Sequence, residues 1–414
     1  MVDRRQWLIG GCGGIGAWLL GSDSTRGGQW LQWRGPSRDG TIPPQDWPDR
    51  LSDGRIRSLW QVPLQPSYSG PIVTDERVMV TETRDKAFEV VTAFDRQSGK
   101  RLWKTEWPGA MEVPFFAAAN GSWIRSTPAC DLEHLYVGGM RDVVVCLRVE
   151  DGREVWRRDF VGEGISQLPA FGLASSPLVD GESLYIQAGG GVTRLDKGSG
   201  RTVWTVLKDS GGMSGGAFSS PVIAELSGVR QLVVQTRTAL AGIDLESGQV
   251  LWQQPVTAFR GMNILTPTII GDSVFTSSYG GKSEAYAIER NGDAWNVRRK
   301  WQHKSQGYMS SPVVVDGAIY LHLRNQRVVC LDAETGHEYW TSTPFGKYWS
   351  MVANAGRILA LDEGGELLLL EASTEKPTII DRLEVGTDTW AHLAVVDDLV
   401  FVRDLLALKV FQWD

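Results

Sequence analysis

Residues 93–103 read AFDRQSGKRLW, and the same pattern recurs four more times along the chain. The other copies read CLRVEDGREVW at 146–156, RLDKGSGRTVW at 194–204, GIDLESGQVLW at 242–252 and CLDAETGHEYW at 330–340. Every copy places a Gly four residues before a Trp, with an acidic or polar residue upstream. Self-similarity at a spacing of roughly 40 to 50 residues indicates the blades of a β-propeller, which are built from short strands and tight turns.

Residues 310–340 form the most regular copy and show how one blade is built. Ser310-Ser311-Pro312 precedes an apolar run that ends at Asp316-Gly317, and two further strands are expected at 319–323 and 327–331. A Thr-Gly turn then leads into a fourth strand that carries Trp340. Four short strands joined by such turns form an antiparallel meander. Openings of the same kind, the last two degenerate, stand at Gly70-Pro71, Thr127-Pro128, Ser176-Pro177, Ser220-Pro221, Thr266-Pro267, Ser350-Met351 and His392-Leu393.

These openings define eight units, but the last unit lacks a fourth strand because the chain ends at Asp414. Residues 58–62, which read SLWQV, can supply that strand from the N-terminal end. Such a pairing closes the ring and leaves no long unpaired strand edge. We therefore predict an all-β fold: a single eight-bladed β-propeller over residues 28–414, with four-stranded antiparallel blades and N-to-C strand closure.

The repeated Trp residues are best explained by packing between blades. On an outer strand an indole is large enough to reach the neighbouring blade, and a nearby Gly lets the ring approach the backbone. The acidic residue and the Ser or Thr before that Gly suit a tight turn. We interpret these Trp residues as a structural girdle in preference to a ligand-binding surface.

The repeat, small-x-Asp-x-x-Ser/Thr-Gly-x-x-x-Trp, resembles the tryptophan-docking motif of pyrroloquinoline-quinone-type propellers, and the resemblance covers residues 30–414. That family includes quinoprotein alcohol dehydrogenases and the non-enzymatic lipoprotein that assists outer-membrane protein assembly. Two further segments, QWRGPSRDG at 32–40 and TWAH at 389–392, are similar to exported quinoprotein-like propellers of planctomycete-type bacteria. The resemblance implies the fold and leaves the chemistry open, because one fold hosts many functions.

The first 27 residues lie outside the repeat and resemble an export signal. Arg4-Arg5 precede an apolar, Gly-rich stretch that runs to Leu20, as in a twin-arginine signal. We therefore expect an exported protein, periplasmic or associated with the cell envelope. Cys12 is a weaker candidate for lipidation, because few apolar residues precede it. Nothing after residue 27 is long and apolar enough to span a bilayer.

Charge and cysteine usage narrow the range of partners. The net charge is −7 and no run of Lys or Arg interrupts the chain, which argues against nucleic acid. Cys130, Cys146 and Cys330 fall on strands that keep them beyond disulfide reach, and we interpret them as small buried residues. No Cys-x-x-Cys motif or Cys/His cluster indicates a metal site. We expect a monomer.

The resemblance to quinoprotein dehydrogenases implies pyrroloquinoline quinone bound with calcium, a carboxylate base and a Cys-Cys lid over the quinone. The chain has no adjacent Cys pair, and no set of Glu, Asn and Asp maps onto the calcium ligands. Glu112, Asp209, Asp362 and Glu363 fall near loops, and we interpret them as solvated carboxylates. We therefore predict no cofactor, no metal ligand and no catalytic residue.

A candidate ligand site lies where the inner strands converge on the central channel. The residue at the head of each opening is usually small and often carries a hydroxyl, which either caps a turn or joins a polar ring around the axis. Larger side chains stand two residues upstream, and they either grip a planar or peptide-like ligand or merely cover the mouth. The predicted ligand mouth consists of Tyr68, Arg125, Phe218, Tyr348, Trp390 and His392.

These observations favour an exported, non-catalytic propeller that binds a protein partner or a small ligand on its top face, in a scaffold or assembly role. That face would include the long loops at 108–124 and 161–175. The alternative is a quinone-dependent oxidoreductase that lacks the usual Cys-Cys lid. A hydrolase or lyase on the same scaffold is a weaker hypothesis, because no Ser/His/Asp grouping follows from the spacing.

Overall fold

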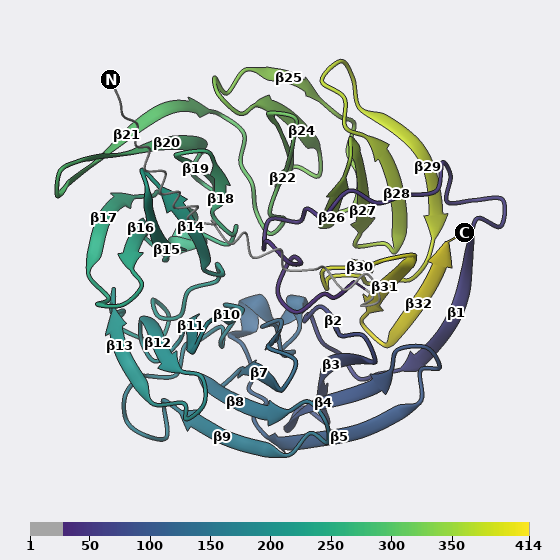
Figure 1. The fold of residues 1–414 in the computed structure, drawn as a ribbon, viewed down its shortest axis with the longest axis horizontal. Coiled ribbons are helices and arrows are strands. Elements are labelled where there is room, and N and C mark those ends of the chain that lie inside the picture. Colours follow the sequence, from purple (N-terminus) through teal and green to yellow (C-terminus); the bar gives the residue numbers. More distant parts are fainter. Residues whose placement is uncertain (1–27, 414) are drawn as a thin grey trace, which may run out of the picture.

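The computed structural model describes residues 28–413 as a ring of eight antiparallel sheets with four strands each (Figure 1). This arrangement confirms the predicted eight-bladed β-propeller. The predicted export signal at residues 1–27, with Arg4, Arg5 and Cys12, lies outside the described residues. Within residues 28–413, no helix is long and apolar enough to cross a membrane.

Chain order and strand order coincide in seven of the blades, so that each unit of the repeat is one sheet. Blade one contains β2 (Ile72–Val73), β3 (Arg77–Arg84), β4 (Phe88–Asp95) and β5 (Arg101–Pro108), and blade two contains β6 (Ala129–Cys130), β7 (His134–Gly139), β8 (Val143–Arg148) and β9 (Glu154–Asp159). Blade three contains β10 (Leu178–Asp180), β11 (Ser183–Gln187), β12 (Val192–Asp196) and β13 (Thr202–Val206), and blade four contains β14 (Val222–Leu226), β15 (Val229–Gln235), β16 (Ala239–Asp244) and β17 (Val250–Pro255). Blades five to seven consist of β18 (Thr268–Ile270), β19 (Ser273–Ser277), β20 (Ser283–Asn291), β21 (Ala294–His303); β22 (Val313–Val315), β23 (Ala318–His322), β24 (Val328–Asp332), β25 (Glu338–Thr341); and β26 (Trp349–Asn354), β27 (Arg357–Asp362), β28 (Glu366–Glu371), β29 (Thr378–Glu384).

The eighth blade joins the two ends of the chain, as the sequence predicts. It contains β30 (Ala394–Val396), β31 (Leu399–Asp404), β32 (Ala407–Trp413) and, as its outer strand, β1 (Ile56–Pro63). The antiparallel register runs from Ile56 opposite Trp413 to Pro63 opposite Ala407. In Figure 1 the purple β1 lies beside the yellow β32. The pairing leaves blade eight without an unpaired β32 edge.

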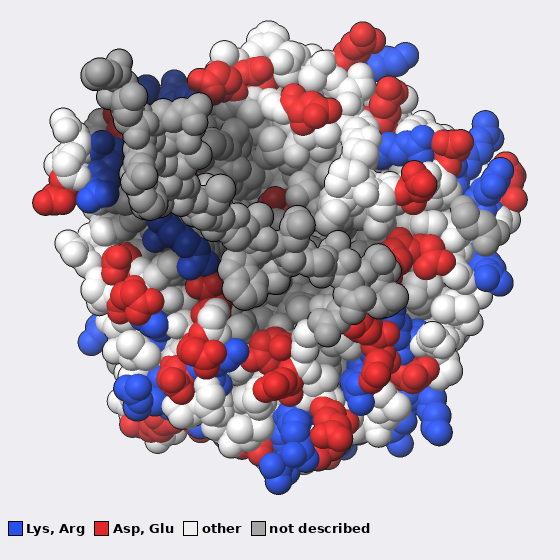
Figure 2. Space-filling view, viewed as in Figure 1, with Lys and Arg blue, Asp and Glu red and all other residues white. Residues whose placement is uncertain are grey.

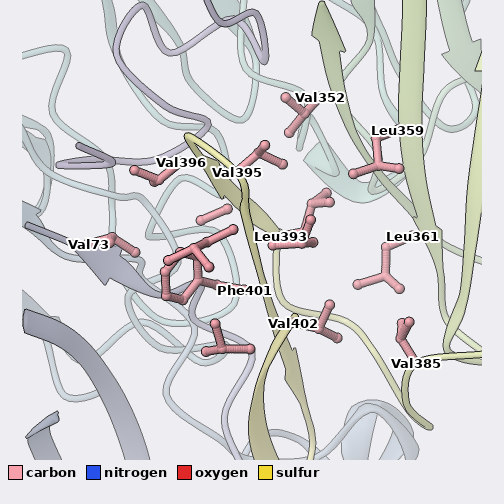
Figure 3. Close-up of a cluster of buried hydrophobic side chains, with 14 of the residues drawn as sticks. Val73, Val352, Leu359, Leu361, Val385, Leu393, Val395, Val396, Phe401 and Val402 are labelled. Carbon is pink, nitrogen blue, oxygen red and sulfur yellow. The ribbon is translucent and has the colours of Figure 1, made fainter. Parts of the chain in front are cut away.

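The hydrophobic core lies between the facing sheets of neighbouring blades, and the interfaces of blade eight with blades seven and one are packed in the same way. One buried cluster combines Val73 of blade one, Val352 and Leu359 of blade seven, and Phe401 of blade eight (Figure 3). Middle strands read as continuous apolar runs, such as VVVCLR in β8, because both faces of each sheet contact a neighbouring blade. The closure therefore buries apolar surface in addition to forming strand hydrogen bonds.

The repeated Trp residues connect successive blades, which supports the girdle interpretation. Trp103 Nε1 donates to the Val149 carbonyl oxygen at 2.8 Å, and its ring lies on Gly152 of the next blade. Gly152 has φ of +72°, and a Cβ built there would lie 2.4 Å from Trp103 Cε3. The Gly of the repeat is thus required twice, for its left-handed backbone and for the indole above it.

The structure adds two docking residues that the repeated pattern does not include. Trp60 Nε1 donates to Arg96 O at 2.9 Å, and Trp301 Nε1 donates to Ala333 O at 3.1 Å. Trp252 departs from the rule, because its Nε1 donates to Gln231 Oε1 of its own blade at 2.6 Å. Blade five offers it no docking turn, since the long hairpin of β20 and β21 replaces the Asp-x-x-Ser-Gly turn there.

Small residues at the heads of the inner strands form a hydrogen-bonded ring around the axis. Gly70 N donates to Thr127 Oγ1 at 2.9 Å, Thr127 N to Ser176 Oγ at 3.0 Å, and Ser176 N to Ser220 Oγ at 2.9 Å. Each hydroxyl therefore satisfies a backbone N–H of the preceding blade. These hydroxyls therefore join a polar ring around the axis, and their role there is to link neighbouring blades.

The cysteines and the charged side chains of the described residues occupy different parts of the molecule. Cys130, Cys146 and Cys330 are buried and free. On the face shown in Figure 2, the described Lys, Arg, Asp and Glu side chains intersperse around the circumference. That view shows charges of both signs in place of a field of one sign.

Candidate functional site

A cavity of about 660 Å³ opens where the inner strands begin, within the size range of ligand pockets. Its wall is a ring of equivalent positions, one from each blade, that lie two residues upstream of the small-residue ring. These positions hold Tyr68, Arg125, Ala174, Phe218, Ile264, Met309, Tyr348 and Trp390. The propeller symmetry thus brings together side chains that are hundreds of residues apart in the sequence.

Five of the six predicted mouth residues line this cavity, and three of them form a continuous aromatic stack. The rings of Tyr348 and Trp390 lie 5.9 Å apart and are nearly parallel at 5°. Tyr68 lies on the other side, with its ring centroid 5.4 Å from that of Trp390. Arg125 and Phe218 complete the set.

His392 is the sixth predicted residue, and it does not line the cavity. His392 occupies the position that small residues hold in the other blades, two residues after the position that lines the cavity. Its side chain is buried. Its ring lies 5.2 Å from Trp33, and its Nδ1 is 2.8 Å from the Leu393 carbonyl oxygen. Burial lowers the pKa of His392 to about 3, so the imidazole is neutral at ordinary pH.

A second aromatic wall comes from two loops that the repeat does not specify. Phe218 packs on Phe171 at 5.7 Å between centroids, and Phe171 packs on Phe116 at 6.2 Å. Phe116 lies in the short 3₁₀ helix η1 (Phe115–Asn120), where Phe115 is 90% exposed. A third contribution comes from η2 (Phe259–Gly261), which places Phe259 and Arg260 at the rim. The predicted long loops at 108–124 and 161–175 thus reach this cavity.

The charged side chains that line the cavity are all arginines: among residues 28–413 they are Arg125, Arg237 and Arg260. Arg237 lies over the Phe218 ring at 4.8 Å and donates to the Arg260 carbonyl oxygen at 2.6 Å. Arg125 donates Nη2 to the Gly121 carbonyl oxygen at 2.8 Å, while its buried Nε has no partner. Burial lowers the pKa of both Arg125 and Arg237, because each guanidinium is desolvated. Carbonyl oxygens therefore position both cations, and an aromatic face also positions Arg237.

The floor of the cavity is Trp33, which belongs to the N-terminal segment QWRGPSRDG at residues 32–40. Trp33 Nε1 donates to Thr266 Oγ1 at 2.9 Å. Beneath it, Arg38 donates to Pro221 O and Pro177 O, each at 2.8 Å. Arg34 is also buried and donates to the Pro312 carbonyl oxygen. The segment therefore plugs the central channel.

Sequence reasoning missed this plug, although one signal was present. The segment stands outside every repeat and places two Arg among Gly and Pro residues. Burial lowers the pKa of Arg34 to about 10 and that of Arg38 to about 9. Both guanidinium groups find backbone carbonyl oxygens that the inner strands leave free at the axis.

The donor set of the cavity does not fit a calcium-bound quinone. Among residues 28–413, no carboxylate lines the cavity, and no three His, Cys, Asp or Glu side chains are grouped to hold a metal ion. Asp209 accepts hydrogen bonds from Gly211 N and Gly216 N. Asp362 corrects the interpretation of solvated loop carboxylates, because it is buried and accepts a hydrogen bond from Glu366 N at 3.0 Å. Both carboxylates stabilise turns.

The structure also shows one Ser–His–Glu group that the spacing did not reveal. His303 Nδ1 lies 2.9 Å from Ser305 Oγ, and His303 Nε2 lies 3.1 Å from Glu338 Oε2. The same Nδ1 faces the Ser305 backbone N at 3.3 Å, and Ser305 Oγ is 2.7 Å from Ser283 Oγ. The imidazole and the hydroxyl are therefore engaged in a local network that fixes the loop after β21.

The docked Trp residues, the eight blades and the closing strand define the class: an eight-bladed propeller of the pyrroloquinoline-quinone type. Residues 87–342 match the family described as outer membrane protein assembly factor BamB. The chain belongs to this family.

Relatives with this description are about a quarter identical to the chain over the aligned residues. The protein from Yersinia pestis is 24% identical over 263 residues, which cover 61% of this chain and 62% of that protein, somewhat under two thirds of its length. The protein from Moranella endobia is 24% identical over 315 residues, which cover 72% of this chain and 73% of that one.

Solved structures show the same fold at lower identity. BamB from Moraxella catarrhalis aligns with a TM-score of 0.64 and 14% identity, over 86% of this chain and 100% of its own. The quinohemoprotein alcohol dehydrogenase of Comamonas testosteroni aligns with a TM-score of 0.61 and 13% identity, over 94% and 81%. Because an assembly factor and an enzyme match equally well, this likeness carries the fold alone.

Proposed function

We propose that this protein is an exported, non-catalytic propeller that binds a protein partner at the arginine-lined cavity and acts as a scaffold in assembly of the cell envelope. The observation that carries the proposal is an aromatic cavity whose apolar lining continues onto the exposed rim. The names of its relatives, which are outer membrane protein assembly factors, support the envelope setting. The Arg4-Arg5 signal predicted from the sequence supports export.

The rim of the cavity exposes several large apolar side chains to solvent. Phe115 is 90% exposed, and Phe116 and Met213 are each about half exposed on neighbouring loops. Contiguous exposed apolar surface next to a cavity marks interaction sites in soluble proteins. Covering these side chains removes apolar area from water, which favours association with a partner that reaches beyond the cavity.

A photo-crosslinking amino acid at position 115 tests the proposal in intact cells. We expect a discrete crosslinked partner from position 115 and none from position 155, because Val155 is exposed on the outer strand β9 away from the cavity. Trp390→Ala combined with Arg125→Ala should abolish the crosslink while the melting temperature stays nearly unchanged. Equal crosslinking from positions 115 and 155, or a crosslink that survives the double substitution, contradicts the proposed function.

A further inference from the structure

Resting on the proposed function, we infer that the partner presents an extended polypeptide segment in which acidic side chains alternate with aromatic or aliphatic ones, and that this segment lies across the cavity mouth. The carboxylates would pair with Arg125 and Arg237, and the apolar side chains would enter between the aromatic walls.

The charge of the cavity selects the acidic component. Within residues 28–413, no carboxylate lies within ion-pair distance of Arg125, Arg237 or Arg260, and the guanidinium groups of Arg125 and Arg237 donate to carbonyl oxygens. Arg125 and Arg237 are oriented and partly desolvated before any partner arrives, so a carboxylate meets them with little further ordering. Within residues 28–413, Arg125 donates to a protein acceptor through Nη2 alone and its Nε is enclosed, so Nη1 is the atom that gains a charge-assisted hydrogen bond when an anion binds.

The walls select the apolar component. Trp390 presents its ring between Tyr68 and Tyr348, and Phe171 and Phe218 line the cavity from the side of blades three and four. These rings form stacking and edge contacts with aromatic side chains and bury aliphatic ones. An acidic segment without apolar residues would leave this surface wet.

The rim and the floor select a polypeptide over a compact molecule. Phe115 stands at the outer end of the Phe218–Phe171–Phe116–Phe115 series and is almost fully exposed, so a molecule confined to the cavity would not cover it. Trp33 closes the opposite end of the cavity. A chain can therefore cross the mouth and insert side chains, but it cannot thread the channel.

Fluorescently labelled peptides of about 12 residues test the inference by anisotropy with the purified protein. One peptide carries alternating Asp or Glu and Phe or Leu, a second replaces every acid with Lys, and a third replaces every apolar residue with Ser. We expect the first to bind at least about tenfold more tightly than either of the others, and to weaken as salt increases.

Paired variants locate the effect. Arg125→Gln with Arg237→Gln should remove the preference for the acidic peptide, while Arg230→Gln, which alters an exposed arginine paired with Asp180 on other strands, should leave it unchanged. Equal affinity for the Lys peptide, no measurable binding of the acidic peptide, or the same loss from Arg230→Gln overturns the inference. If position 115 still crosslinks a partner in that case, the proposed function stands and only the chemistry of the segment is wrong.

Discussion

The Trp–Gly docking contact between blades five and six can be tested by a double-mutant cycle. Trp301 is 8% exposed, and its ring lies on Gly336, which has φ of +72°. Trp301→Ala should cost about 3–5 kcal/mol of unfolding free energy, the range for emptying a large buried aromatic site. A Cβ on Gly336 would lie 2.4 Å from Trp301 Cε3, so Gly336→Ala adds overpacking of about 1–3 kcal/mol to a left-handed backbone cost of about 1–2 kcal/mol.

In the Trp301→Ala background the clash is absent and only the backbone cost of Gly336→Ala remains, so the two substitutions should couple by about 1–3 kcal/mol. Urea unfolding followed by circular dichroism measures each free energy, provided the slope with urea stays constant. Gly317→Ala is the matched control, because Gly317 lies in the same blade with φ of +76° and open space around its Cβ position. If Gly336→Ala costs the same with and without Trp301, the docking explanation of the repeat is wrong.

Three further predictions follow from particular contacts. Deleting residues 28–63 removes β1 together with the plug, so the melting temperature should fall, and the exposed β32 edge should cause association in size-exclusion chromatography; a truncated chain that shows no association and melts like the intact one contradicts the clasp. Trp204→Ala should cost less in urea unfolding than Trp301→Ala, because Trp204 is only half-buried and its Nε1 lies 3.3 Å from Leu245 O; an equal or larger cost would show that exposure does not set the value. Burial raises the pKa of Glu89 from 4.5 to about 7, so the folded state binds the extra proton and stability falls as pH rises between these values, by roughly 3 kcal/mol. Glu89→Gln should flatten that slope, and an unchanged slope would assign it to other groups.

The fold was predictable because each blade carries its own copy of the same instructions. A Gly before a Trp, a small residue before a Pro and short apolar runs recur at equivalent positions in the units. A strand that is ambiguous in one unit can therefore be assigned from the equivalent residues of another unit. The sequence pattern did not identify Trp301 as a docking residue, because the β20–β21 hairpin lacks the turn that precedes the Trp in the other copies. The pattern did not identify Trp60 as a docking residue either, because Trp60 lies on β1, which precedes the first repeat in the sequence.

The site was predictable to the extent that it obeys the same register. Tyr68, Arg125, Phe218, Tyr348 and Trp390 are equivalent positions, and symmetry brings equivalent positions together. His392 is two residues further along and therefore falls in the inner ring, where the chain is buried. The walls built by residues 115–120 and 259–261 come from loops of unequal length, whose conformations the repeat does not encode.

The plug explains how a regular eight-bladed ring and irregular loops at its mouth coexist in one molecule. The inner strands of blades one to six follow prolines, which cannot donate hydrogen bonds, and the carbonyl oxygens of Pro177 and Pro221 point to the axis. An apolar plug would leave those oxygens unsatisfied, whereas the guanidinium of Arg38 donates to both of them and to Ser176 O. The cation is buried without a carboxylate, and the carbonyl dipoles take the place of a counter-ion. Because the axis is sealed and its carbonyl oxygens are satisfied independently of the top loops, those loops are free to shape the mouth at which we propose that a partner binds.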